Sequence, residues 1–87
     1  MVRGRAEWMK PIDDPILETI RDEGNLTPQA LDDFDVTVAD YAGKRCKKLA
    51  RYGLLEQISR GLYRLTETGR AYLDEELDAS TLEPTED

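Results

Sequence analysis

Seven basic side chains that could contact a polyanion gather in one window of the chain, residues 41–64. The window holds a single acid, Glu56, and carries a net charge of +6, whereas the remaining residues hold five basic and 18 acidic side chains, or −13. Together they give −7 over 87 residues. A cationic island on an acidic protein is suited to binding a polyanion, and the alternative is a solvated helix face that happens to be basic. The seven are Lys44, Arg45, Lys47, Lys48, Arg51, Arg60 and Arg64.

The remaining composition is poor in groups for catalysis or metal binding. The chain has no histidine and one cysteine, Cys46, which excludes Ser–His and Cys–His nucleophile pairs and, in practice, a structural zinc site. Its six glycines fit neither phosphate-loop pattern. Adjacent acids such as Asp13 and Asp14 point in different directions on a helix. We therefore expect no enzyme activity, no metal and no cofactor.

Length and hydropathy limit the class of protein further. Eighty-seven residues suffice for one small domain with a modest core. No stretch approaches the roughly 18 consecutive apolar residues of a membrane-spanning helix. The first residues, MVRGRAEWMKP, lack the apolar centre of a secretory signal. These features predict a cytoplasmic protein without a membrane segment.

Periodicity predicts four helices and one hairpin. Apolar residues recur at spacings of three and four before Gly24, and again after two candidate N-caps, Thr27 and Thr37. The spacing then becomes two, and Gly61 suits the tight turn of a hairpin. Thr66 is the candidate N-cap of a last helix. The predicted elements are helices at 13–23, 28–34 and about 38–52, strands at 54–58 and 62–65, and a helix at 66–77.

This α+β order divides the chain into three parts. An N-terminal arm covers 1–10, a domain covers 11–77, and an acidic tail covers 78–87 that we expect to be disordered because it is polar and charged. Trp8 is expected to pack with Tyr72, Leu73 and Leu77, either as a dimer surface or as part of the core.

The third helix has two unlike faces. Val38, Ala42, Cys46 and Leu49 step by four, four and three, so we expect them to share one buried face. The opposite face carries the basic cluster. The second helix, a short turn and this third helix form a helix-turn-helix, whose second helix enters the DNA major groove. Charge and topology therefore indicate the same segment, 38–52.

The order of motifs in the second half is similar to that of a known family. The run RCKKLARYGLLEQISRGLYRLTETGRAYL resembles a winged helix-turn-helix, with Gly-Leu-Leu after the recognition helix and a hairpin closing on Tyr-Arg-Leu-Thr-x-x-Gly. Together with EWMKPIDDPILETIRDEGNLTPQAL it resembles, over about residues 5–79, the small haloarchaeal proteins described as phage phi-H repressor-like. The resemblance implies a repressor-like transcriptional regulator that binds duplex DNA as a homodimer. The segment DVTVADYAG, at 35–43, departs from that pattern.

The basic face of the third helix is expected to contact DNA. Lys44 and Lys47 lie one turn apart and are assigned to base edges or phosphates, with Tyr41 nearer the groove floor. Gly43 is expected to permit close approach of the backbone. Lys48 and Arg51 lie farther along and are assigned to phosphates, which fix register without reading sequence.

Three further basic residues complete the predicted DNA-binding set. Arg60 stands at the wing tip and is assigned to the flanking backbone or minor groove, and Arg64 to phosphate. Arg45 flanks the buried stripe, so an intramolecular salt bridge is an equal alternative for it. The full set is Tyr41, Gly43, Lys44, Arg45, Lys47, Lys48, Arg51, Arg60 and Arg64.

Two broader alternatives bear on function. A winged helix can serve as a protein-interaction module without reading DNA, and the acidic remainder of the chain favours that role mildly.

The acidic balance is also typical of proteins that live in molar potassium chloride, where charge steering is nearly lost because the Debye length falls to about 3 Å. Cys46 is expected to be a small core residue rather than a redox switch.

Overall fold

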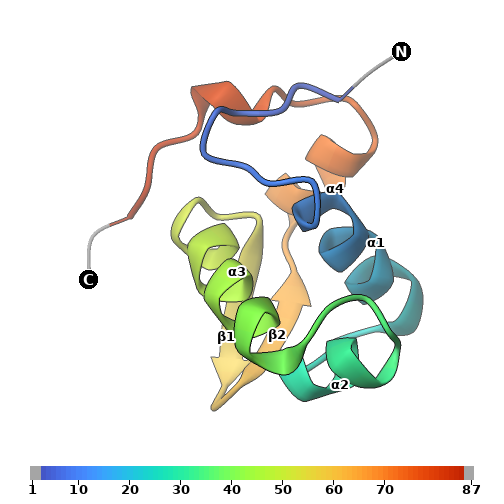
Figure 1. The fold of residues 1–87 in the computed structure, drawn as a ribbon. Coiled ribbons are helices and arrows are strands. Elements are labelled where there is room, and N and C mark those ends of the chain that lie inside the picture. The colour runs from blue at the N-terminus through green and yellow to red at the C-terminus, as the bar shows by residue number, and fades with distance from the viewer. Residues whose placement is uncertain (1–2, 86–87) are drawn as a thin grey trace.

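The computed structural model describes residues 3–85 as helices packed around a two-stranded hairpin (Figure 1). This arrangement confirms the predicted α+β class and the winged helix-turn-helix architecture. Within the described residues, no helix has both the length and the apolar character needed to cross a membrane. The elements are α1 (Asp13–Glu23), α2 (Pro28–Asp33), α3 (Ala39–Arg51), β1 (Leu55–Ser59), β2 (Leu62–Leu65), α4 (Glu67–Leu73) and a 3-10 helix, η1 (Ala79–Thr81).

Two of the three threonine caps predicted from the sequence are confirmed. The hydroxyl of Thr27 accepts a hydrogen bond from the amide of Ala30 at 3.1 Å, and that of Thr66 accepts one from Gly69 at 2.9 Å. These bonds satisfy amides that the first turn of a helix leaves free. The third prediction is wrong, because the N-cap of α3 is Val38 and not Thr37.

The last helix is shorter than predicted. It ends at Leu73, four residues before the expected end at 77, because Glu75 adopts a left-handed conformation with φ 65°. The amide of Glu76 then donates to the carbonyl of Ala71 at 2.8 Å, which closes the helix in a Schellman motif. Gly53 ends α3 in the same way, with φ 83° and a bond from Leu54 to Leu49.

The wing is an antiparallel hairpin with a third, isolated partner. Leu55 pairs with Leu65 and Gln57 with Tyr63, and a bulge follows between Gln57 and Ser59. Leu26, just before α2, exchanges both backbone hydrogen bonds with Tyr63, at 3.1 and 2.9 Å. The helix-turn-helix is thereby joined to β2, so the wing and α3 hold a fixed relationship.

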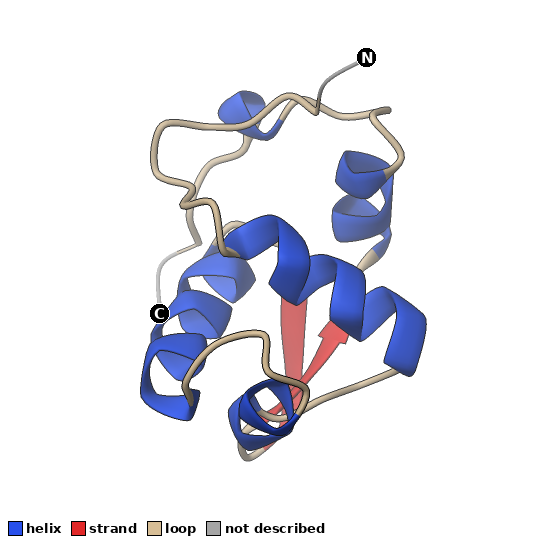
Figure 2. Cartoon of the chain, turned by 45° about the vertical axis from the view of Figure 1, so that its right-hand side comes forward, coloured by secondary structure: helices blue, strands red, loops and turns tan. Residues whose placement is uncertain are grey.

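The core fills the space between the helices and the hairpin. In Figure 2 the two strands lie behind the helix that crosses the middle of the view, α1. Ile16 and Leu17 of α1, Leu49 of α3 and Tyr72 of α4 are all fully buried. Of the stripe predicted on α3, Ala42, Cys46 and Leu49 are buried as expected. Val38 is not, because it precedes the helix and points into solvent, 62% exposed.

The two terminal segments lie side by side along one end of the molecule (Figure 1). Gly4 pairs with Asp78, and the amide of Ala79 donates to the carbonyl of Gly4 at 2.6 Å. Ala79 is fully buried. The structure thus places residues 78–82 against the arm and the core, and the expected disorder of 78–87 stays a prediction. Residues 1, 2, 86 and 87 lie outside the described residues.

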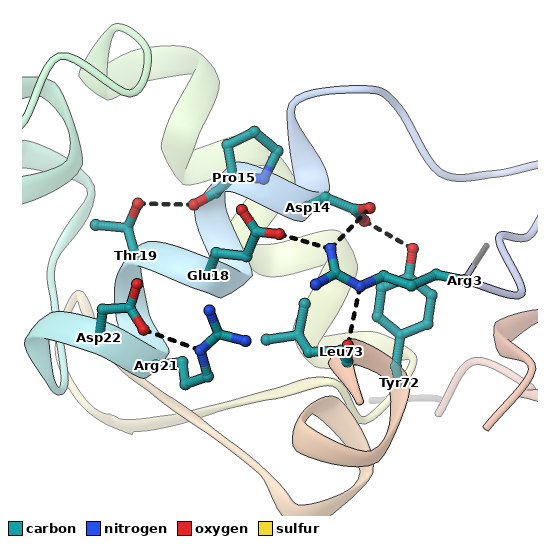
Figure 3. A network of polar contacts seen from close by, with 9 residues as sticks. All are labelled: Arg3, Asp14, Pro15, Glu18, Thr19, Arg21, Asp22, Tyr72 and Leu73. Carbon is teal, nitrogen blue, oxygen red and sulfur yellow. Dashed lines mark hydrogen bonds and ion pairs between the residues drawn. The ribbon is translucent and has the colours of Figure 1, made fainter. Parts of the chain in front are cut away.

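The N-terminal arm is held by charge as well as by backbone pairing. The guanidinium of Arg3 contacts Asp14 and Glu18 of α1 at 3.3 and 2.6 Å, and its Nε donates to the carbonyl of Leu73 at 3.0 Å (Figure 3). The hydroxyl of Tyr72 donates to the same Asp14 at 2.7 Å. One cluster thus links the arm, α1 and α4.

Trp8 packs within its own chain. Its ring stacks on Tyr52, just after α3, with centroids 3.9 Å apart and 13° between the planes. Tyr72 and Leu73, the expected partners of Trp8, are buried in the core. Trp8 therefore packs against the core of its own chain with Tyr52 as its stacking partner, and a dimer through this region stays a prediction.

Candidate nucleic-acid interface

A tight turn joins α2 to α3 and sets the direction of the second helix. Asp35 takes a left-handed conformation, φ 62°, which aspartate tolerates better than most residues. The amide of Val36 donates to the carbonyl of Leu31 at 2.9 Å. The carboxylate of Asp32 accepts from the amide of Ala39 at 2.9 Å, so a side chain of α2 caps the start of α3. The two helices are fixed by backbone and cap together.

The outward face of α3 carries the predicted basic side chains. Lys44, Lys47 and Arg51 are exposed, and Tyr41 is 37% exposed at the first turn. Lys48 is partly covered, with its ammonium 6.0 Å from the centre of the Tyr52 ring. Among residues 3–85, no carboxylate lies within ion-pair distance of these cations, whereas Arg3, Arg21, Arg45 and Arg64 are paired.

Arg45 turns the other way. Its Nε and Nη2 donate to the two oxygens of Asp13 at 2.9 and 2.8 Å, and Nη2 also donates to the carbonyl of Trp8 at 3.1 Å. Asp13 is fully buried. The hydrogen bond to Asp13 raises the pKa of Arg45 above its ordinary value. The predicted DNA contact of Arg45 is therefore replaced by the intramolecular salt bridge that its position beside the buried stripe allowed.

Gly43 faces a neighbouring helix. A Cβ placed on it would meet Pro28 of α2 at 3.7 Å, which is an ordinary contact distance. Gly43 thus lies against α2 of the helix-turn-helix, and the close approach of its backbone to DNA stays a prediction.

The wing extends the basic surface beyond α3. Arg60 is exposed in the turn between the strands, where Gly61 has φ 72°. Arg64 is also exposed, but its Nε donates to Glu56 on the opposite strand. That pair neutralises part of the charge predicted for the outer face of the wing. Arg60 remains exposed at the tip without an ion-pair partner among the described residues.

A hollow of about 560 Å³ lies between α3 and the wing. Two cations that the sequence predicted, Lys47 and Arg51, stand at its edge. Ala50 of α3 lies beside them, and the sequence did not predict the contributors from β1, β2 and the C-terminal segment. Thr85 reaches this place by donating from its amide to the carbonyl of Arg51 at 2.7 Å. The lining residues are Lys47, Ala50, Arg51, Gln57, Tyr63 and Thr85.

Sequence reasoning also missed the exposed apolar residues of this surface. Phe34 is 50% exposed at the end of α2, and Ile58 is 44% exposed on β1. Ile58 stands in the bulge between Gln57 and Ser59, which turns it away from the core. The alternation of a strand does not reveal a bulge, so this orientation had no clear sequence signal.

Cys46 is placed as expected for a core residue. It is fully buried on the inner face of α3, and burial raises the pKa of its thiol from 9.0 to about 12. A thiol in this state is not an effective nucleophile near neutral pH. Cys46 therefore contributes no reactive group to this surface, whose exposed side chains include cations and apolar groups.

Comparisons with known proteins agree with this architecture. A family model described as winged helix-turn-helix phage repressor matches residues 1–85. The crystal structure of the PhiH1 repressor-like protein from Haloarcula marismortui superposes with a TM-score of 0.90 at 40% sequence identity. The match covers 97% of this chain and 98% of that one. None of the curated proteins matches this chain.

Proposed function

Because this chain belongs to the winged helix-turn-helix phage repressor family, and is thereby a DNA-binding regulator, we propose that it binds specific duplex sites through α3. In this proposal α3 enters the major groove and the turn at 59–61 lies on the flanking backbone or minor groove. The supporting observation is that the basic side chains on the outward face of α3 are exposed and unpaired within the described residues. Lys44, Lys47 and Arg51 are exposed and have no carboxylate partner among residues 3–85.

This observation favours DNA over a role in binding proteins alone. The described acids that form ion pairs do so with Arg3, Arg21, Arg45 and Arg64. Cations left unpaired on an otherwise acidic surface are suited to phosphates, which lie at a fixed spacing along duplex DNA. The hollow between α3 and the wing adds a concave edge next to Lys47 and Arg51.

Each residue of the face has a proposed part. Lys44 and Lys47 contact base edges or phosphates, with Tyr41 beside them at the first turn. Lys48 and Arg51 contact phosphates and fix the register of the helix. Arg60 contacts the flanking backbone or minor groove. Arg64 contributes less, because Glu56 already accepts its hydrogen bond.

The proposal includes two copies on one operator. The molecule measures 31 × 30 × 20 Å, so two copies side by side would separate their recognition helices by about one turn of DNA, roughly 34 Å. A site of two half-sites about 10 base pairs apart would support this arrangement. Selection of bound duplexes from a random library measures that spacing directly.

Replacing Lys44 and Lys47 by alanine tests the role of the face. We expect the double variant to remain folded and to lose about 1–3 kcal/mol of binding free energy for the selected site. The matched control is Lys10→Ala with Arg70→Ala, which removes the same charge from two exposed positions outside α3. If the two double variants lose equal binding free energy, the loss comes from net charge and not from the face of α3, which would contradict the proposal.

Binding should also be measured across potassium chloride concentrations, since the similar structure comes from Haloarcula marismortui. Each phosphate contact adds close to one unit to the slope of log affinity against log salt. We expect Arg51→Ala to reduce that slope by about one unit. An unchanged slope would remove Arg51 from the contacts with phosphate.

A further inference from the structure

The exposed large apolar side chains of residues 3–85 are confined to the helix-turn-helix and the wing. They are Phe34, Val38, Tyr41 and Ile58, and none lies on α1, α4 or the described terminal segments. Exposing large apolar groups to water is unfavourable, so their restriction to these elements suggests a contact there. The distribution places that contact on the helix-turn-helix and the wing.

Val38 is the most exposed of the four, and its position is well defined. It is the N-cap of α3 with extended backbone, φ −69° and ψ 149°, and its side chain makes no capping bond. Its carbonyl accepts from the amide of Ala42 at 2.9 Å, which ties its backbone to the helix. Tyr41 follows one turn later, 37% exposed. A rigid backbone therefore presents two apolar groups at the leading end of α3.

The leading end of a recognition helix contacts base edges in the major groove. The side chain of Val38 cannot donate or accept a hydrogen bond, so it cannot read the polar edges of bases. The one apolar group that a base pair presents in the major groove is the C5-methyl of thymine. We propose that Val38, supported by Tyr41, recognises thymine methyl groups and so determines part of the site's sequence. The inference rests on the proposed function, because it requires α3 in the groove.

A second copy of the chain is the competing occupant, and charge disfavours it. A symmetric contact through the end of α3 would bring two basic faces together, each with Lys44 and Lys47 exposed. Juxtaposed like charges weaken an interface, whereas DNA offers the opposite charge beside the methyl groups. The apolar contact also withstands salt, since screening acts on charges and not on a buried methyl group.

Deoxyuridine substitution measures the contact, because uracil differs from thymine only by lacking the methyl group. Thymines of duplexes selected from a random library would be replaced one at a time. We expect the wild-type protein to lose about fourfold in affinity at each thymine that Val38 contacts, the loss for one buried methyl. Val38→Ala keeps only its β-methyl group and should lose most of this preference for thymine over uracil at that position. The wild-type ratio should stay constant as potassium chloride rises, while the affinity itself falls.

The controls separate this inference from the proposed function. Ile58→Ala removes an exposed apolar group of the wing and should keep the wild-type ratio, and thermal unfolding confirms that both variants are folded. If the wild-type protein binds the selected duplexes specifically but shows equal affinity for thymine and uracil at every position, the inference is wrong and the proposed function still stands. No binding to any duplex overturns both. If Val38→Ala changes the sedimentation of the DNA-free protein and not the ratio, a second copy is the occupant and the inference is wrong.

Discussion

Arg45 on the recognition helix donates two hydrogen bonds to the fully buried carboxylate of Asp13 at the start of α1, at 2.9 and 2.8 Å. The second oxygen of Asp13 also accepts from the amide of Lys10 at 2.9 Å, and Arg45 donates to the carbonyl of Trp8. The pair therefore joins α3 to α1 and to the N-terminal arm. It fixes which side of α3 faces inward, and so which side is left for DNA.

Removing one member of this pair should be strongly destabilising. Arg45→Ala leaves the carboxylate of Asp13 buried without its charged partner, and losses of this kind are about 3–5 kcal/mol. Urea unfolding followed by circular dichroism measures the change. Lys44→Ala, one residue earlier and exposed, is the matched control and should change the free energy of unfolding by less than about 0.5 kcal/mol.

The double variant Asp13→Leu with Arg45→Met tests the physical cause. Replacing both charges by apolar groups of similar size removes the burial penalty, and such replacements are often neutral or stabilising. We expect the double variant to recover most of the stability that Arg45→Ala loses. A double variant as unstable as the single one would mean that the pair contributes by shape and not by charge.

The glycine in the Thr-x-x-Gly motif should not accept alanine, whereas Gly43 should. A Cβ on Gly69 would lie 2.2 Å from the carbonyl oxygen of Leu54, a distance that forces the backbone apart. A Cβ on Gly43 would lie 3.7 Å from Pro28, with no clash. We expect Gly69→Ala to cost about 3 kcal/mol and Gly43→Ala to stabilise the fold by about 0.5–1 kcal/mol through helix propensity. Thermal unfolding of the two variants measures both changes. A Gly69→Ala variant as stable as the wild type would contradict the close contact between Gly69 and the carbonyl of Leu54.

The sequence predicted elements where local chemistry is explicit. Thr27 and Thr66 mark helix starts, and Gly53 marks the end of α3, because a threonine cap and a left-handed glycine are both visible in one residue. The end of α4 was missed because a glutamate, Glu75, takes the left-handed position that glycine usually holds. The start of α3 was misplaced because its cap is supplied by Asp32, seven residues away.

The orientation of the basic side chains was predicted where charge and helical period agree, and was missed where tertiary contacts decide it. The exposure of Lys44 and Lys47 follows from the helical period. The inward turn of Arg45 depends on a carboxylate 32 residues away in sequence, which no periodicity reveals. The order of the last described residues depends likewise on Gly4, which pairs with Asp78 across the whole chain.

Stability should fall in alkali because buried groups keep their protons. Burial raises the pKa of Cys46 from 9.0 to about 12, and burial, followed by the hydrogen bond to Asp14, raises that of Tyr72. Above pH 9 the unfolded chain therefore binds fewer protons than the folded one. The free energy of unfolding is unaffected below that pH. It then falls by about 1.4 kcal/mol per pH unit for each group, through the window from 9 to 12 for Cys46 and only above the ordinary pKa of 10.0 for Tyr72.

Cys46→Ala isolates the contribution of the thiol. We expect this variant to lose about 1.4 kcal/mol per pH unit less than the wild type between pH 9 and 12, as measured by urea unfolding at fixed pH values. Native protein at pH 8 should also react with a thiol reagent only as fast as it unfolds. Fast reaction at pH 8 without unfolding would show an accessible thiolate and contradict the burial of Cys46.

The C-terminal segment should stabilise the domain up to η1 and contribute little beyond it. A chain ending at Leu77 loses the pairing of Asp78 with Gly4, the buried Ala79 and the packing of Leu82 against the core. Burial of these apolar groups is worth about 2 kcal/mol, so we expect a loss of that order in urea unfolding. A chain ending at Leu82 keeps all three and loses only the hydrogen bonds from Thr85 to Arg51, which are exposed, so its loss should stay below about 1 kcal/mol. Equal stability of the full chain and the chain ending at Leu77 would mean that 78–82 adds nothing to the fold, against the complete burial of Ala79.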